Sequence, residues 1–278
     1  MKQRRIVFSN RKGGCGKTAS AVNVAAGLAL VGKKVLLVDC DPQGHASVSL
    51  GFSPYEETIN LYDLLNETNE INEAIKKTKW PEGLSFIPAT GQLAAYELEH
   101  SQDQSKKGLL AKYLLSHEAA EFDYILMDPP PTVGLLNLMC MIAAKEALIP
   151  VQTHFLSMEG LAEMVRFIYQ INATVNPDLR ITGIIPTFYN RKFSLAKEVV
   201  KEIKKNFGED MLLPAIRQSM SIAESPGFGD CIFKYAPGSN GAFDYARLVE
   251  KIDGGKLINP FNNKKKVVAK KKKKKKKK

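Results

Sequence analysis

The stretch NRKGGCGKTAS, at residues 10–20, decides the fold of this chain. It lies between a short apolar run, Ile6-Val7-Phe8, and a segment rich in alanine and valine. Its glycines let successive backbone N–H groups turn around an anion, because no Cβ blocks the approach. The N-terminus of the following helix adds partial positive charge. The pattern therefore predicts a phosphate-binding loop, and the alternative is a glycine turn with a purely structural role.

The residues beside the glycines indicate which anion the loop would bind. Lys17 would reach the β- and γ-phosphates of a nucleotide, and the Thr18 hydroxyl would ligate Mg²⁺. The usual pattern GxxxxGK[ST] begins with glycine, but this chain has Arg11 at that position. The motif here is KGGxGKT, with an additional lysine, Lys12, at the front edge of the loop.

Two further aspartates follow predicted buried strands. Asp41 lies in VDCDPQGHASVSLG after the second strand, and Asp128 ends the apolar strand of ILMDPPPTVGLL. Ligands of open α/β sheets bind at the carboxyl ends of the strands, so both carboxylates are expected to face the site. Asp128 has the arrangement of a residue that holds Mg²⁺ directly or through water. The alternatives are helix capping by Asp39 and Asp41 and a structural role for Asp128.

Helical and strand periods alternate along the chain without an internal repeat or a linker before Asp253. This alternation predicts one doubly wound α/β domain over residues 1–253, with a mostly parallel sheet flanked by helices. Strands are predicted at 5–9, 34–39, 84–87, 124–127, 147–151 and 181–188. Helices are predicted at 18–31, 61–65, 71–77, 109–120, 158–175 and 195–207.

The composition indicates the cellular compartment and the character of the C-terminal residues. The formal net charge is +11, and twelve lysines after Asn263 supply more than all of it, which leaves the body at −1. A uniform lysine block buries nothing, so residues 254–278 are predicted to form a disordered lysine-rich tail. No run of eighteen apolar residues and no signal peptide is found, and four scattered cysteines fit reduced thiols in the cytoplasm.

Several motifs resemble those of one known family. KGGxGKT with its early lysine is similar to the deviant Walker A motif of the ParA/MinD group of P-loop ATPases. The segment DCDPQGHAS resembles that family's DxDPQxxxS, and residues 216–248 resemble its C-terminal signature, with Glu224, Pro226 and Gly229 in the expected order. The resemblance covers nearly all of residues 1–253 and favours the ParA branch, the plasmid and chromosome partition ATPases.

The resemblance implies ATP and Mg²⁺ as cofactors, and it implies roles for individual residues. Lys12, Lys17 and Asp41 would be catalytic, with Lys12 crossing a dimer interface to the other subunit's phosphates. Thr18, Asp41 and Asp128 would hold or surround the metal. The ATP-binding residues would be Lys12, Gly13, Gly14, Cys15, Gly16, Lys17, Thr18 and Ala19. Ala19 departs from the family's usual threonine at that position.

The resemblance also implies a function and partners. The ATP-bound homodimer would bind non-specific DNA of the nucleoid and move chromosome, plasmid or other large cargo, while a ParB-like protein stimulates hydrolysis. Location would be cytoplasmic and nucleoid-associated. Candidate DNA contacts are Arg191, Lys192, Arg217, Lys270, Lys274 and Lys278. The helix at 195–207 is basic, and a solvated surface is its alternative role; Ser221 replaces an arginine that family members often use for DNA contact.

Two other functions share the same loop. A MinD-like membrane-associated regulator would need an amphipathic C-terminal helix, but Gly254-Gly255 and Pro260 interrupt any helix there, so a membrane partner is not expected. An electron-transfer ATPase like the nitrogenase iron protein needs cysteines at a dimer-bridging cluster, and neither Cys140 nor Cys231 lies in a matching segment. The lysine tail itself fits DNA, anionic lipid or simple solubilisation.

Overall fold

A computed structural model describes residues 3–53, 58–154 and 157–255 of the chain. The predicted tail beyond Gly255, with the candidate DNA contacts Lys270, Lys274 and Lys278, lies outside the described residues.

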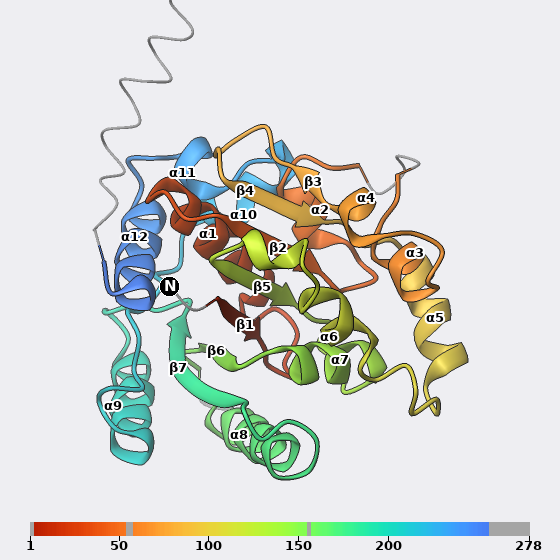
Figure 1. Ribbon diagram of the computed structural model, residues 1–278. Helices are drawn as coiled ribbons and strands as arrows, with labels where there is room; N and C mark the ends of the chain where they lie inside the picture. Colours follow the sequence, from red (N-terminus) through yellow and green to blue (C-terminus); the bar gives the residue numbers. More distant parts are fainter. Residues whose placement is uncertain (1–2, 54–57, 155–156, 256–278) are drawn as a thin grey trace, which may run out of the picture.

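A seven-stranded sheet forms the centre of the molecule (Figure 1). Its order is β3-β4-β2-β5-β1-β6-β7, and all neighbours are parallel except β3 and β4. The strands are β1 (Arg4–Phe8), β2 (Val35–Asp39), β3 (Lys76–Lys77), β4 (Leu84–Ile87), β5 (Tyr124–Asp128), β6 (Glu146–Gln152) and β7 (Arg180–Thr187). Every residue of β2 and β5 is buried, as expected for strands covered on both faces. The predicted doubly wound α/β fold is confirmed.

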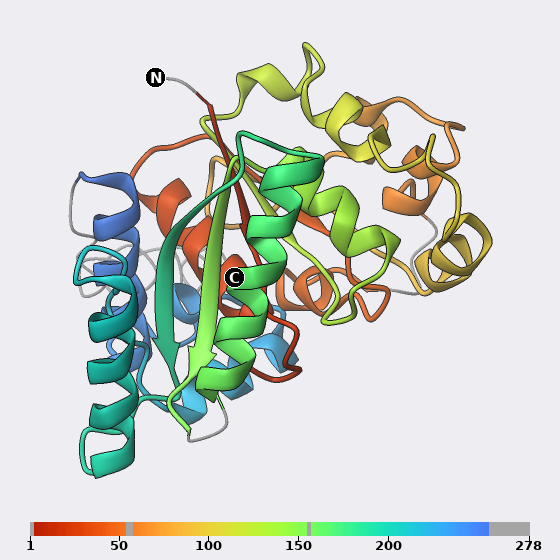
Figure 2. The same ribbon diagram turned by 90° about the horizontal axis from the view of Figure 1, so that it is seen from below.

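Helices cover both faces of this sheet (Figures 1 and 2). Alternate strand residues supply two cores, since Ile6 and Phe8 pack with α1 and α12 while Val7 packs with α3 and α5–α8. The α-helices are α1 (Lys17–Leu30), α2 (His45–Ser49), α3 (Leu61–Leu65), α4 (Ile71–Ala74), α5 (Gln92–His100), α6 (Leu109–Leu114), α7 (Leu135–Ala143), α8 (Ser157–Thr174), α9 (Ser194–Phe207), α10 (Met220–Glu224), α11 (Ile232–Tyr235) and α12 (Asn240–Asp253). Two 3₁₀ turns are η1 (Ala119–Glu121) and η2 (Ser225–Phe228).

Two predicted helices end earlier than expected. The helix predicted at 71–77 ends at Ala74, because Ile75 is extended and Lys76 pairs with Phe86 of β4. The helix predicted at 109–120 ends at Leu114, and only the short turn η1 follows. Five helices were not predicted, namely α2, α5, α7, α10 and α11. In α7 nearly every residue is apolar and buried, so its sequence shows no amphipathic stripe.

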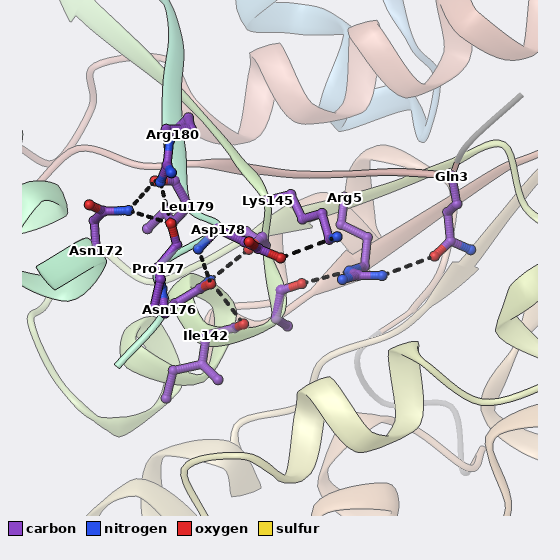
Figure 3. A network of polar contacts seen from close by, with 12 residues as sticks. Gln3, Arg5, Ile142, Lys145, Asn172, Asn176, Pro177, Asp178, Leu179 and Arg180 are labelled. Carbon is purple, nitrogen blue, oxygen red and sulfur yellow. Dashed lines mark hydrogen bonds and ion pairs between the residues drawn. The ribbon is translucent and has the colours of Figure 1, made fainter. Parts of the chain in front are cut away.

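The amino ends of the strands carry a network of satisfied polar groups, which Figure 3 shows. The Asn176 amide donates to the carbonyls of Met141, Ile142 and Ala144 at 2.7–3.1 Å and so caps the C-terminus of α7. Arg5 donates to the carbonyl of Ala143 at 2.8 Å. Cations beside the carbonyls at a helix C-terminus stabilise its dipole.

The same end of the sheet fixes the last described helix. Arg4 forms a bidentate ion pair with Glu146 at 2.6 and 2.7 Å and also donates to the carbonyl of Ile252. Tyr124 donates to Asp253 at 2.8 Å, and Lys33 pairs with the same carboxylate at 3.0 Å. The C-terminus of α12 is therefore held beside the first strand.

All four cysteines, Cys15, Cys40, Cys140 and Cys231, are free and buried. Burial raises the pKa of the Cys15 thiol, and it raises the pKa of the Cys231 thiol to about 12.

Candidate nucleotide site

The glycine-rich loop connects β1 to α1 at the carboxyl edge of the sheet. Gly14 and Gly16 adopt positive φ angles of 68° and 89°, which other residues rarely adopt. Gln152 of β6 donates to the Gly14 carbonyl at 2.7 Å, and Thr187 of β7 donates to the Cys15 carbonyl at 2.8 Å. Because these two side chains occupy loop carbonyls, the loop N–H groups are left to face an anion.

The two lysines of the loop have opposite environments. Lys17 is the first residue of α1 and only 7% exposed, whereas Lys12 is exposed at the front of the loop. The backbone N–H of Lys12 donates to the Asn10 side chain at 3.0 Å, and Asn10 in turn donates to the Pro150 carbonyl at 2.7 Å. The loop is therefore fixed at Asn10 and at the main chain of Lys12, while Lys12 itself is exposed.

Asp128 ends β5, the strand next to β1. It is 1% exposed, and neither of its carboxylate oxygens has a hydrogen-bond partner among the residues that the structure describes. Burial raises the pKa of Asp128 well above its ordinary value and Asp39 adds to the rise, while Thr18 and Lys17 act in the opposite direction. A buried carboxylate without partners fits a cation, and oxygen donors are what Mg²⁺ prefers.

The two aspartates after β2 differ in their contacts. Asp39 is buried and accepts hydrogen bonds from the N–H of Asp41 at 3.2 Å and from the N–H and hydroxyl of Ser47 at 2.8 Å each. Burial raises the pKa of Asp39 to about 6 although these donors lower it. Asp41 is half-buried and accepts from the N–H of Gln43 at 3.0 Å. Asp39 therefore shapes the loop, and Asp41 is the carboxylate available to the site.

An apolar pocket of about 310 Å³ lies beside the loop. It is lined by Gly16, Thr18, Ala19, His45, Val48, Ser49, Thr187, Phe188, Ile216, Arg217, Gln218, Ser219, Ile222, Ala223, Pro226 and Tyr245. Its size and lining suit a nucleoside attached to phosphates in the loop. Sequence reasoning missed most of this lining, because the segments at 187–188 and 216–226 carry no nucleotide motif.

Phe188 forms one wall of the pocket in an unusual backbone conformation. Its φ is 52°, in the left-handed region that bulky residues avoid. Thr153 holds it there, since its hydroxyl is 3.3 Å from the carbonyls of both Thr187 and Phe188. Such residues gather at functional sites because the surrounding contacts must fix them. No sequence pattern indicated this conformation.

The structure brings together three of the candidate DNA contacts. Arg191, Lys192 and Arg217 line one surface hollow of about 350 Å³, although the third is distant in sequence from the other two. Arg191 and Lys192 are exposed, and so are the lysines of α9, namely Lys197, Lys201, Lys204 and Lys205. Arg217 differs, because its guanidinium is bound to Asp244 at 2.7–3.1 Å.

Comparison with known proteins identifies the family. A family model described as an AAA domain matches residues 3–181. The chromosome partitioning protein ParA of Caulobacter vibrioides is 34% identical over 250 residues, which cover 90% of this chain and 93% of that protein. The chain belongs to the ParA/Soj family of P-loop ATPases.

Other ParA/Soj proteins support the assignment. The sporulation initiation inhibitor protein Soj of Bacillus subtilis is 36% identical over 247 residues, which cover 89% of this chain and 97% of that protein.

Among solved structures, cobyrinic acid a,c-diamide synthase from Mycobacterium smegmatis with bound ADP and magnesium has a TM-score of 0.73 at 28% identity, covering 92% of this chain and 98% of that one. Among the residues that the structure describes, no helix combines the length and hydropathy needed to span a bilayer.

Proposed function

We propose that this chain is a magnesium-dependent ATPase of the ParA type. Its ATP-bound form dimerises, binds DNA without sequence preference and drives segregation or positioning of a chromosome, plasmid or other large cargo, with a ParB-like protein that stimulates hydrolysis. The observation that carries the proposal is that a buried lysine, Lys17, at the base of the glycine loop lies at the same edge of the sheet as Asp128, a buried carboxylate without a hydrogen-bond partner among the described residues.

The residue roles follow from these positions. Backbone N–H groups of residues 13–19 and the Lys17 ammonium bind the phosphates, and the pocket beside Ala19 takes the nucleoside. Thr18 and Asp128 would hold Mg²⁺, and Asp41 would orient the attacking water. Mg²⁺ neutralises negative charge on the β- and γ-phosphates when it is bound.

Lys12 has a separate role. A second lysine beside Lys17 adds little within one subunit, and its exposure allows it to reach the phosphates of a partner subunit. A cation supplied in trans stabilises charge on the transferred phosphoryl group. The γ-phosphate then joins the two subunits only until it is hydrolysed, which makes the dimer a switch.

The DNA surface is proposed at the carboxyl edge of the sheet. Exposed Arg191 and Lys192, which lie just before the basic helix α9, are its proposed contacts. Residues 1–253 are proposed as the ATPase domain and 254–278 as a lysine-rich tail that adds affinity for DNA. Such contacts act through phosphates, so affinity falls steeply with salt. The protein would act in the cytoplasm, on the nucleoid.

An experiment with the full-length chain tests the proposal. Mass and DNA binding are measured with ATP, ADP and a non-hydrolysable ATP analogue, for the wild type and for Asp41→Ala. We expect a monomer with ADP, and a DNA-binding dimer with the analogue. Asp41→Ala should form this dimer with ATP itself and hydrolyse ATP at least about tenfold more slowly. A mass and a DNA affinity that do not respond to nucleotide would refute the proposal.

A further inference from the structure

The contact between Arg217 and Asp244 ties a loop to a helix at the nucleotide pocket. The Arg217 Nε lies 2.9 and 3.1 Å from the two carboxylate oxygens of Asp244, and its Nη2 lies 2.7 Å from Oδ1. The backbone N–H of Arg217 also donates to Oδ2 at 2.9 Å. Asp244 belongs to α12 and is only 5% exposed. One buried carboxylate therefore fixes both the main chain and the side chain of Arg217.

The segment fixed in this way is a wall of the pocket. Residues 216–219 all line it, and they lie outside the sheet and the helices. They also pair with the end of β7 and the residues after it, since the Ile216 N–H donates to the Pro186 carbonyl at 2.8 Å and the Gln218 N–H to the Tyr189 carbonyl at 3.3 Å. Tyr245, the residue after Asp244, lines the same pocket. Asp244 is thus the anchor of this wall on the α12 side.

We propose that the Arg217–Asp244 pair is a positioning device that holds residues 216–219 in place against the nucleotide base and so determines how much the base contributes to binding. This inference rests on the proposed ATPase function. It assigns Arg217 to the pocket rather than to DNA. Recognition of a base requires polar groups placed within about 0.5 Å, and a loop without regular structure reaches that precision only when it is fixed from both sides.

The charge pair suits this task for a physical reason. A bidentate guanidinium–carboxylate contact is directional as well as strong, so it sets the orientation of the loop and not only its distance from α12. Because Asp244 is buried, loss of Arg217 would leave an uncompensated charge, and the loop would move to relieve it. Loss of the pair would weaken contacts to the base and not those to the phosphates, which bind to the glycine loop.

The test separates the base from the phosphates. Affinities for Mg²⁺-ATP and for Mg²⁺-tripolyphosphate, which has no base, are measured by calorimetry on the full-length protein. We expect Asp244→Asn and Arg217→Lys to weaken ATP binding about tenfold, since each disturbs charge-assisted hydrogen bonds, and to leave tripolyphosphate binding unchanged. Arg217→Lys keeps the charge but not the bidentate geometry, so it tests whether the orientation of the loop matters. It also provides a second variant in case Asp244→Asn does not fold.

Glu146→Gln is the matched control. It disrupts another bidentate arginine pair, Arg4–Glu146, at the opposite end of the sheet. It is expected to change neither affinity. Equal losses for ATP and tripolyphosphate in the Asp244 and Arg217 variants, or no loss for either ligand, overturn the inference. A loss of DNA affinity without a change in ATP affinity would also overturn it and make Arg217 a DNA contact. A wild type that binds neither ligand overturns the proposed function as well.

Discussion

Asn176 and Asp128, at opposite ends of the sheet, differ in their polar contacts. At the amino end, Asn176, Arg5 and Arg4 each meet carbonyls or carboxylates, and the network of Figure 3 ties β1, β6, β7 and α7 together. At the carboxyl end, Asp128 has no hydrogen-bond partner among the described residues, and Phe188 has a positive φ. Both ends are built on the same strands, so the difference does not come from the sheet.

The difference between Asn176 and Asp128 indicates that Asp128 is kept for ligand binding at a cost in stability. A buried polar group that lacks a partner costs free energy, and a chain keeps it where a ligand will later supply the partner. Substitutions at the carboxyl end should therefore change ligand binding more than stability. Those at the amino end should do the reverse.

The largest effect is expected for Lys17→Ala. Lys17 is buried at the base of the loop, where its ammonium would make charge-assisted hydrogen bonds to two phosphates. ATP affinity should fall about a hundredfold or more, since each such bond contributes about 1.5–3 kcal/mol. Titration calorimetry measures the loss. The control is Lys12→Ala, which should bind ATP as a monomer within a few-fold of the wild type; retained ATP binding by the Lys17 variant would break the contrast.

Asp128→Asn should make the protein without nucleotide more stable. Asp128 is buried and lacks a hydrogen-bond partner among the described residues, so replacing its carboxyl group is expected to raise the free energy of unfolding by about 2 kcal/mol. The variant should also lose the extra stabilisation that Mg²⁺ adds to ATP. Urea denaturation with and without Mg²⁺-ATP measures both effects.

Asp39→Asn, at the same edge of the sheet, is the variant to compare with Asp128→Asn. Asp39 accepts from two groups of Ser47, and an amide nitrogen turned toward these donors cannot accept. This variant should therefore be less stable than the wild type. If both aspartate variants shift stability in the same direction, the distinction between a partnered and a partnerless carboxylate is wrong.

Asn176→Ala should destabilise the fold by about 2 kcal/mol, because several carbonyls at the C-terminus of α7 lose their donor. ATP affinity should not change, as the cap lies at the amino end of the sheet. Chemical denaturation together with calorimetry tests the pair of expectations. Asn172→Ala, in the same network but partly exposed, should cost less. An ATP affinity that falls with the cap would show that the two ends are coupled.

The smallest effect is expected for Arg11→Ala. Arg11 contacts Glu163 at 3.5 Å, and both side chains are about half exposed. Exposed ion pairs of this kind contribute about 0.5 kcal/mol or less. Stability and ATP affinity should both stay near the wild-type values although Arg11 lies in the phosphate loop. A large loss of ATP affinity would mean that this part of the loop also contacts the ligand.

The sequence predicted the carboxyl end better than the amino end. Strands at 84–87 and the helix at 61–65 have the predicted bounds, and parallel strands necessarily bring Lys17 and Asp128 to one edge. Short local motifs are sufficient to predict which side chains lie at this edge, because each motif follows a strand that ends there. The helix α7 was missed because it is apolar on all sides, and the strand β3 because two residues are too few to show a period.

Contacts between distant segments were not predictable in the same way. The Arg217–Asp244 pair joins an irregular loop to a helix, and no sequence pattern in the loop orients Arg217 toward that helix. The family resemblance implied that Arg217 is a DNA contact. In the structure its guanidinium is bound to a carboxylate, which charge counting cannot reveal.

The burial of all four cysteines makes the native thiols reporters of local unfolding. A thiol reagent that cannot reach a buried sulfur reacts only when the surrounding segment opens, so the labelling rate measures the frequency of opening. Cys15 lies in the phosphate loop, Cys140 in α7 and Cys231 next to α11, so mass spectrometry of labelled peptides would time the opening of three separate regions in one unmodified protein. Nucleotide should slow the labelling of Cys15 most.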